Sequence, residues 1–500
     1  MTRNLQGSWL AGLERLGNRL PHPTLLFVWL CILLWPLSAL ASLLQADLTH
    51  PGTGDALVLR SLVSTEGLRY QLSHLVSNFT GFAPLGVVLV AMLGIGIAER
   101  AGLLAALLQA LLRSCPTALL VPVVAFAGVM SSLAADAGYV VLVPLAALLF
   151  QQAGKPPLLG IAVAFAAVSG GFSANLLVGP VDALLAGLTT EAIHITDPAG
   201  GIHAASNYWF IIASTVLVTV VVSLVARPLE RQLPAATQGA AQDPTPADSP
   251  APDSAGNRQA LLWATVALAA WLALLGVATL PDDAPLRQGP GVSLLTSPFI
   301  THIVVLVALG FALCGYVYGR VSGAFRSAGD AIEAMEDTMR TMAGYLVLMF
   351  FAAQFVAWFN WTGMGLALAV SGAQWLATLA LPEALLLVVL VLLVGLINLF
   401  IGSASAKWAV LAPVFVPMLM VLGVSPEATQ AAFRVGDSAT NIITPLMPYF
   451  ALVLGFARQY QRDAGIGTLM ALMLPFSLSL MLAWTILLAL WASLALPFGP

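Results

Sequence analysis

Long apolar segments recur along the chain and predict helices that cross a membrane. Each reaches about 20 residues, the length that an α-helix needs to traverse the hydrocarbon core of a bilayer. The ends of such segments are accurate to a few residues. We predict nine spans, at 24–44, 80–98, 158–187, 206–226, 260–280, 300–320, 341–360, 428–457 and 467–495.

Two further apolar segments, 116–153 and 383–424, are interrupted by small and polar residues. The second has the tip GSASA at 402–406, followed by Pro413 and Pro417. Lipid excludes unpaired backbone unless that backbone is buried in protein or lines a wet cavity. We therefore predict that both segments are re-entrant hairpins and that their tips contribute to a binding site.

The two hairpins belong to a repeat, in which segment 131–182 corresponds to 402–448. Both copies run from a small-residue tip through an apolar stretch with proline and a polar turn to G-x-S-A-x5-P. Interrupted hydrophobic segments in corresponding halves are typical of transporters with a site at the repeat interface. The ungapped matches are Gly171 with Gly436, Ser173 with Ser438, Ala174 with Ala439 and Pro180 with Pro445.

Charges in the short loops predict the orientation, because cytoplasmic loops carry an excess of lysine and arginine. The N-terminus would be cytoplasmic, and the first hairpin would enter from the cytoplasm and the second from outside. An odd number of crossings between the copies makes the repeat inverted. The cytoplasmic markers are Arg3, Arg15, Arg19, Lys155, Arg227, Arg231, Arg320, Arg326, Arg458 and Arg462; the outside ones are Asp47, Asp55, Glu191, Asp197, Asp282 and Asp283.

The connecting segments complete the organisation. Segments 99–114 and 363–380 precede the hairpins and are short, which favours helices lying near the interface. Segment 325–340 is an amphipathic cytoplasmic helix, and the Pro/Ala/Asp-rich 232–257 is a linker that need not order. We expect scaffold helices at 1–114, a transport unit at 115–190, scaffold helices at 191–382, a second transport unit at 383–457 and a scaffold helix at 458–500.

Composition excludes several classes of protein. Of 500 residues, 59% are hydrophobic and 8% charged, and no soluble domain has that balance. No basic patch suggests nucleic acid, and we expect an uncleaved first helix. Phosphate-binding, zinc-binding and nucleophile-elbow motifs do not occur in the sequence, so an ion gradient would have to drive transport. Three separated cysteines, Cys31, Cys115 and Cys314, are expected to pack as small apolar residues.

Five charged residues lie at membrane depth, where each costs at least a few kcal/mol and so marks a functional candidate. Arg434 and Asp437 share a helical face and could neutralise each other. Alternatively, Arg434 binds a substrate carboxylate and Asp437 lies where a cation binds or a proton is carried. Lys407 and Asp136 follow the two tips and face either the site or an aqueous vestibule. The fifth, Asp182, follows Pro180 in the first interrupted helix.

Oxygen-bearing residues surround both hairpins and suit a hard cation. Around the second they are Asn398, Ser403, Ser405 and Asp437, and around the first Ser131, Ser132, Ser173 and Asn175. Trp408, beside the second tip, offers a flat apolar face to an aromatic substrate or belongs to an interface belt. His194 and His203 fall in an outside loop, where we expect solvated side chains.

Several motifs together resemble the AbgT family of bacterial p-aminobenzoyl-glutamate transporters, some of which expel sulfonamide antimetabolites. They are FTGFAPLGVVLVAMLGIGIAERAGL, SSLAADAGYVVLVP, SGGFSANLLVGPVDALLAG, GSASAKWAVLAPVFVPM and FRVGDSATNIITPLMPYF. The resemblance implies a homodimer in the inner membrane, each subunit with nine membrane-spanning helices and two re-entrant hairpins. It implies a sodium site at Asn398 and Asp437, and a substrate site of Asp182, Ser405, Trp408, Pro426, Arg434, Asp437 and Pro445.

The fold class expected is thus an all-α polytopic membrane protein. The function expected is sodium- or proton-driven transport of p-aminobenzoyl-glutamate, or of p-aminobenzoate-like aromatic anions, with no organic cofactor. A cation-coupled carrier of dicarboxylates or fatty acids would share the two-hairpin design without needing Trp408. An intramembrane enzyme would need a nucleophile–base pair or a metal cluster, and the sequence offers neither.

Overall fold

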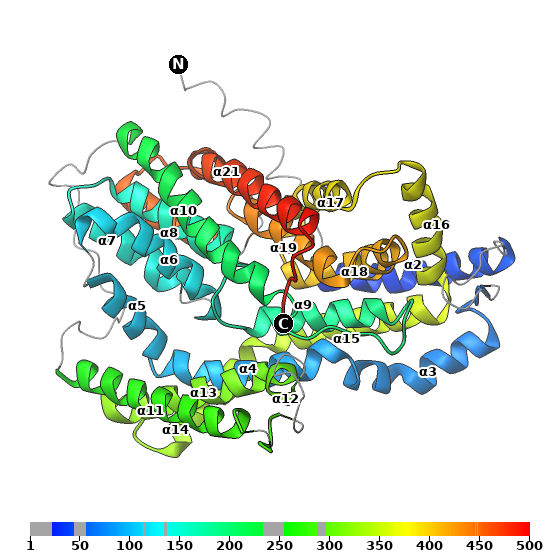
Figure 1. Cartoon of the computed structure of the whole chain (residues 1–500), viewed down its shortest axis with the longest axis horizontal. Coiled ribbons are helices and arrows are strands. Elements are labelled where there is room, and N and C mark those ends of the chain that lie inside the picture. The colour runs from blue at the N-terminus through cyan, green and yellow to red at the C-terminus, as the bar shows by residue number, and fades with distance from the viewer. Residues whose placement is uncertain are drawn as a thin grey trace.

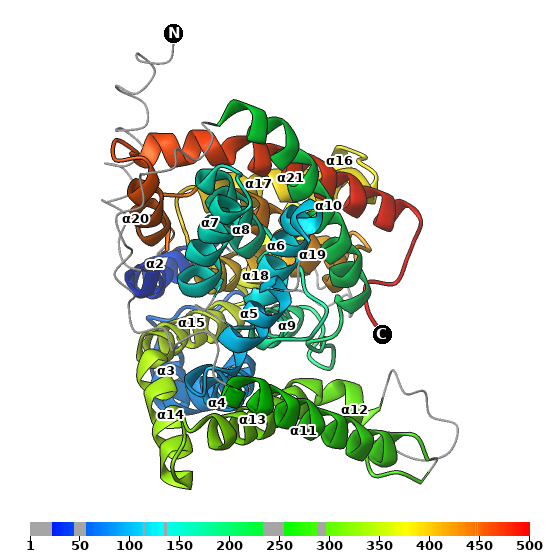
Figure 2. The same ribbon diagram turned by 90° about the vertical axis from the view of Figure 1, so that its left-hand side faces the viewer.

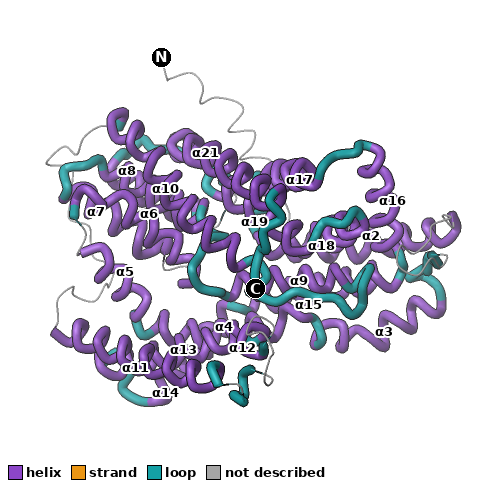
Figure 3. Tube along the Cα trace, in the orientation of Figure 1, coloured by secondary structure: helices purple, strands orange, loops and turns teal. Residues whose placement is uncertain are grey.

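The chain folds into a bundle of helices in the computed structural model. The structure describes residues 23–44, 57–113, 116–134, 138–233, 255–281, 283–287, 297–445, 447 and 449–500. Within those ranges the regular elements are all helices, joined by turns and loops (Figure 3). Eight described helices are long and apolar enough to cross a membrane, and the pair of α16 (Met364–Thr378) and α17 (Glu383–Asn398), bent by 118°, would make nine.

One end of the molecule is built on α4 (Ala83–Arg100) and α13 (Ile303–Ser322), which pack along each other. Their backbones approach closely at Gly94, where a Cβ would lie 2.1 Å from the carbonyl oxygen of Ala308. α11 (Ala255–Thr279) packs on α13, and α14 (Ala328–Thr341) packs on α4. Figures 1 and 2 both place α11 and α14 at this end, away from α10 and α21.

The first copy of the repeat contains α6 (Leu120–Met130), α7 (Val143–Gln152), α8 (Pro157–Gly170) and α9 (Pro180–Ile193). Both α6 and α7 pack against α8, whose residues are all buried. The predicted span 158–187 is thus two helices, α8 and α9, separated by a non-helical break at 171–179. The break begins with Gly171 and ends where Pro180 opens α9, as proline favours at a first helical position.

The second copy contains α17, α18 (Ala404–Val421), α19 (Pro426–Asn441) and α20 (Phe450–Tyr460). α17 packs along α19, and the contact requires glycine at 436. A Cβ there would lie 2.4 Å from the carbonyl oxygen of Val391. The predicted span 428–457 is likewise divided, into α19 and α20, so both interrupted helices of the repeat are present.

The two copies meet at equivalent residues. The backbone N–H of Ser173 donates to Oγ of Ser438 at 3.2 Å, and α8 contacts α19. Residues related by a pseudo-two-fold axis contact each other only where that axis passes, so this bond marks the centre of the repeat. The long helices α10 (Tyr208–Gln232) and α21 (Ile466–Ser493) pack on each other and on α8 (Figure 1).

Most predicted helices are found within a few residues of their expected bounds. The remaining predicted spans correspond to α2 (Pro23–Leu44), α4, α10, α11, α13, α15 (Ala343–Trp361) and α21, while α5 (Leu103–Arg113), α14 and α16 match the three short helices. The sequence analysis missed two short helices, α3 (Thr65–Thr80) and α12 (Pro298–Thr301). α18, within the predicted second hairpin, is itself long and apolar enough to span; the re-entrant course of both hairpins stays a prediction.

Candidate functional site

The centre of the site is one face of α19. Gln430, Arg434, Asp437 and Asn441 recur at intervals of four, three and four residues, which places them on a single helical face. All four are buried. α19 contacts α8, α9, α17, α18 and α21, so these polar groups face protein rather than lipid.

Arg434 is bound to the first copy of the repeat. Its Nη1 lies 2.8 Å from Oδ1 of Asp182, whose Oδ2 accepts the backbone N–H of Gly179 at 2.7 Å. Asp182 therefore both caps the N-terminus of α9 beside the break and carries a charge toward the second copy. The expected alternative, a pair between Arg434 and Asp437, is not formed.

Two further donors of Arg434 have no acceptor. Its side chain is 2% exposed, yet Nε and Nη2 make no hydrogen bond within the described part of the chain. A buried donor left unsatisfied typically costs 1–3 kcal/mol, and more when it is charged. The planar guanidinium holds pairs of donors in a fork that matches a carboxylate, so the geometry is suited to an incoming carboxylate.

Asp437 is paired with Lys407. Nζ of Lys407 lies 2.5 Å from Oδ1 of Asp437 and also contacts Oδ1 of Asn398. The side chains of Lys407 and Asp437 are 0% and 1% exposed, so Lys407 faces the site and not an aqueous vestibule. Asp136, the equivalent candidate in the first copy, lies outside the described residues.

The Asn398 amide is held in one orientation. Its Nδ2 lies 2.7 Å from the carbonyl oxygen of Asp437, 2.8 Å from Oγ1 of Thr440 and 2.9 Å from Oδ1 of Asn441. This fixes Oδ1 toward Lys407. The two side-chain groups expected to ligate sodium, Asn398 and Asp437, thus already hold an ammonium. With that ammonium in place sodium does not fit between them, because it would meet a like charge at contact distance.

The oxygen-bearing residues of the first hairpin are brought together only in part. Nδ2 of Asn175 donates to Oγ of Ser132 at 2.8 Å, while Oδ1 of Asn175 accepts the backbone N–H groups of Leu176 and Leu177. The Asn175 amide oxygen is therefore already used. Ser131 donates to the carbonyl of Gly128. A second cation site including Ser173 stays a prediction.

Trp408 lies in the interior and not in an interface belt. Its ring is fully buried and packs on Phe433, with ring centroids 4.5 Å apart. Nε1 donates to Oγ1 of Thr189 at 2.9 Å, and Gln430 donates to the same oxygen at 2.8 Å. Thr189 belongs to α9, so Trp408 joins α18 to the first copy, and its ring partner Phe433 is the residue before Arg434 in the chain.

The other predicted substrate residues lie at the ends of elements. Ser405 is in the first turn of α18, where its Oγ is 3.1 Å from Oγ of Ser403, the N-cap. Pro426 opens α19, about 12 Å along the helix from Arg434 at 1.5 Å per residue, too far to touch the same small group. Pro445 is half-buried in the turn between α19 and α20.

The loop that we predict to lie outside the membrane is less exposed than expected. His194 and His203 are both half-buried, and burial lowers the pKa of the His203 imidazole. Cys31 and Cys314 are buried, as expected for packing residues, and Cys115 lies outside the described residues.

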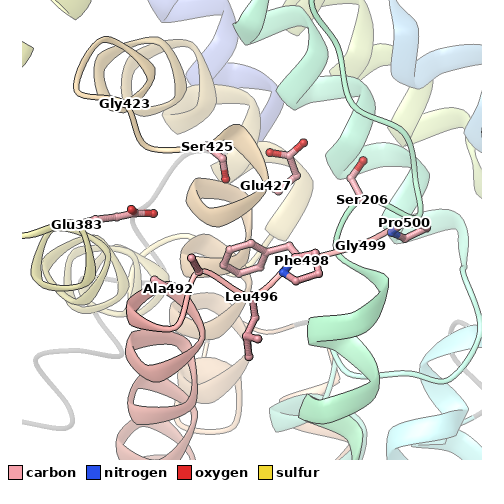
Figure 4. Close-up of a pocket in the computed structure, with 12 residues that line it drawn as sticks. Ser206, Glu383, Gly423, Ser425, Glu427, Ala492, Leu496, Phe498, Gly499 and Pro500 are labelled. Carbon is pink, nitrogen blue, oxygen red and sulfur yellow. The ribbon is translucent and has the colours of Figure 1, made fainter. Parts of the chain in front are cut away.

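A hollow of about 400 Å³ lies beside the N-terminal ends of α17 and α19 (Figure 4). Glu383, Glu427, Ser206 and Phe498 are among the residues that line it. None of the described residues lining it belongs to the Arg434 or Lys407 clusters, which are closed off from solvent. The conformation is therefore one in which the charged site is occluded.

The site contains residues that the sequence analysis did not select. Thr189, Gln430, Thr440 and Asn441 supply most of the neutral hydrogen bonds around Trp408 and Asn398. Spacing along α19 carries a usable signal for Gln430 and Asn441, because they share the face of Arg434. Thr189 carries none, because α9 meets α18 and α19 only through the tertiary fold.

Comparison with known proteins agrees with this architecture. Residues 8–500 match the family model described as "AbgT putative transporter family". The chain belongs to the AbgT family. It is 35% identical over 494 residues to the p-aminobenzoyl-glutamate transport protein of Escherichia coli (strain K12), covering 99% of this chain and 96% of that protein. The resemblance seen in the sequence motifs is confirmed.

Two solved AbgT-family structures are similar to the whole fold. The Alcanivorax borkumensis YdaH transporter is 61% identical with a TM-score of 0.91, over 96% of this chain and 100% of that one. Neisseria gonorrhoeae MtrF, described among antimetabolite efflux pumps, is 42% identical with a TM-score of 0.89, over 96% and 97%. The chain is a multi-pass membrane transporter and not an enzyme.

Proposed function

We propose that this AbgT-family transporter carries p-aminobenzoyl-glutamate or p-aminobenzoate-like aromatic anions, driven by a gradient of sodium ions or protons. The export of sulfonamide antimetabolites belongs to the same proposal. The observation that carries it is Arg434, a buried cation with two donors unused. An anionic solute would satisfy these donors where water does not reach.

The surroundings of Arg434 favour an aromatic solute. Trp408 packs on Phe433 and shares the Thr189 hydroxyl with Gln430, which lies on the Arg434 face of α19. An aromatic ring can add to such a ring pair by offset or edge-to-face contact. Both rings are buried, so binding would require Trp408 to shift from Phe433 or the solute to pack at the edge of the pair. The relative from Escherichia coli is named for an aromatic carboxylate of this kind.

Transport requires the occluded site to open alternately to each side. We propose that the two copies of the repeat move as a transport unit against the remaining helices. α9 begins two residues before Asp182 and α19 ends four residues after Asp437, so displacement of either half-helix would change access to Arg434. The proposal includes a homodimer in the bacterial inner membrane, with the N-terminus in the cytoplasm and scaffold helices at the interface.

A carrier of dicarboxylates is the alternative, since Arg434 would bind any carboxylate. The two are distinguished by uptake into proteoliposomes of labelled p-aminobenzoyl-glutamate, a labelled sulfonamide and labelled succinate, under an imposed sodium gradient and then a proton gradient. We expect accumulation of an aromatic compound under one gradient and none of succinate. Accumulation of succinate alone, or of none of the three compounds under either gradient, would contradict the proposal that the solute is an aromatic anion.

A further inference from the structure

The charged groups of the second hairpin are arranged unlike an open cation site. The ammonium of Lys407 lies between Asn398 and Asp437, the two candidate cation ligands. It is completely buried, and it is attached to the hairpin through the backbone of α18. Lys407 is the fourth residue of α18, just after the tip 402–406, and it reaches across to α17 and α19. The position is therefore shared by three elements of one repeat copy.

The location of Lys407 is unfavourable without its partner. The N-terminal end of a helix carries a partial positive charge, which disfavours a cation in the first turn. Burial adds a further penalty, because a charge removed from water is stable only when it is paired. Asp437 supplies that pairing at 2.5 Å. A lysine at a position that both the helix terminus and burial disfavour is explained if its positive charge is needed to balance Asp437.

The Asn398 amide is committed as well, whereas Oδ2 of Asp437 has no hydrogen-bond partner among the described residues. Oδ1 of Asn398 faces the ammonium, and Nδ2 is surrounded by three acceptors, so the amide cannot turn without losing them. We propose that Lys407 is the resident cation of the Asn398–Asp437 site, and that its ammonium excludes sodium from that site. The Asp437 carboxylate is neutralised by the chain itself.

This inference takes only the location of the site from the proposed function, and its consequence concerns ion binding without solute. Removing the ammonium would leave a buried carboxylate, an amide oxygen and nearby hydroxyls with no cation. Those are the oxygen ligands that a hard metal ion prefers. Lys407→Met removes the charge while keeping the length of the chain, and it should create a sodium site that the native protein lacks.

The experiment uses the purified full-length protein in lipid nanodiscs, without solute. Thermal unfolding and ²²Na⁺ binding are measured in sodium chloride and in choline chloride at equal ionic strength. The chain has one other lysine, Lys155, which pairs with Glu230 at 2.6 Å, so Lys155→Met is the matched control. We expect the native protein and Lys155→Met to unfold at the same temperature in both salts, with no saturable ²²Na⁺ binding.

Lys407→Met should instead gain saturable ²²Na⁺ binding and a midpoint raised by roughly 2–4 °C in sodium, as expected for a ligand that binds only the folded state. Lys407→Met with Asp437→Asn should lose both. If Lys407→Met does not fold, ²²Na⁺ binding to the native protein tests the inference instead. Saturable ²²Na⁺ binding that Asn398→Ala abolishes would overturn the inference, and no binding supports it. Neither result changes the solute test above.

Discussion

The two copies of the repeat share an architecture but differ in chemistry. α8 is fully buried and carries no charged residue, with Ser169 and glycines as its departures from apolar side chains. α19 occupies the equivalent place and buries Arg434, Asp437, Gln430 and Asn441. The first copy supplies one charge to the described site, Asp182, and it does so from the N-terminus of α9.

This difference shows that the second copy carries most of the buried polar and charged groups of the site, while α8 of the first copy supplies apolar packing. The apolar α8 packs against α6, α7, α10 and α19, and Ser173 bonds to Ser438 at the centre. The buried polar face of α19 is stabilised because Arg434 pairs with Asp182 of the first copy and Asp437 pairs with Lys407 of the same copy. The following predictions test that division, beginning with the largest effect.

Removing Arg434 should abolish transport, because no other described residue presents unpaired buried cationic donors here. Arg434→Ala also leaves Asp182 as an unpaired buried carboxylate, which typically costs 3–5 kcal/mol. We therefore expect Arg434→Ala with Asp182→Asn to recover much of the folding stability but not uptake. Uptake into proteoliposomes and thermal unfolding are measured in parallel. If transport survives in Arg434→Ala, Arg434 is structural.

Closing the gap between α17 and α19 should destabilise the second copy. Gly436→Ala places a methyl group 2.4 Å from a backbone oxygen, and overpacking of this kind costs about 1–3 kcal/mol. The matched control is Gly455→Ala on α20, where the added Cβ meets nothing within 4 Å. Thermal unfolding in detergent compares the two. Equal unfolding midpoints for the two variants would show that α17 and α19 can move apart without a loss of folding stability.

Replacing Trp408 tests the aromatic contact. Trp408→Phe keeps a ring beside Phe433 but loses the hydrogen bond to Thr189, which contributes about 1 kcal/mol. We expect binding of p-aminobenzoyl-glutamate to weaken by about tenfold or less, and Trp408→Ala to weaken it further. Thr189→Val is the control, since it keeps the tryptophan while removing the acceptor that Trp408 and Gln430 share. Affinities unchanged in Trp408→Ala would remove the aromatic contact from the account.

The bond between the copies should have the smallest effect. Ser438→Ala leaves the backbone N–H of Ser173 without its acceptor, at a cost of about 1 kcal/mol, and removes no charge. We expect uptake close to that of the native protein and a slightly lower unfolding midpoint. A loss of uptake comparable to that of Arg434→Ala would instead make this contact part of the transport cycle.

Sequence reasoning located most of the helices and selected the charged residues of the candidate site, because apolar length and interrupted helices are visible along the chain. Buried charges at 182, 407, 434 and 437 could be selected for their cost in a membrane. Their pairing could not. Arg434 and Asp437 are three residues apart, yet each binds a partner from another element, and only the packing of α9 and α18 against α19 decides that. Thr189 was invisible for the same reason.

The central claim is that Arg434 binds the carboxylate of an aromatic solute. Isothermal titration calorimetry of p-aminobenzoate and of its uncharged amide tests it, using protein with Asp182→Asn alone and with Asp182→Asn plus Arg434→Ala. We predict that the acid binds at least about tenfold more tightly than the amide when Arg434 is present, a coupling of about 1.4 kcal/mol. That preference should vanish without Arg434. An equal preference for the acid in both proteins would contradict the account.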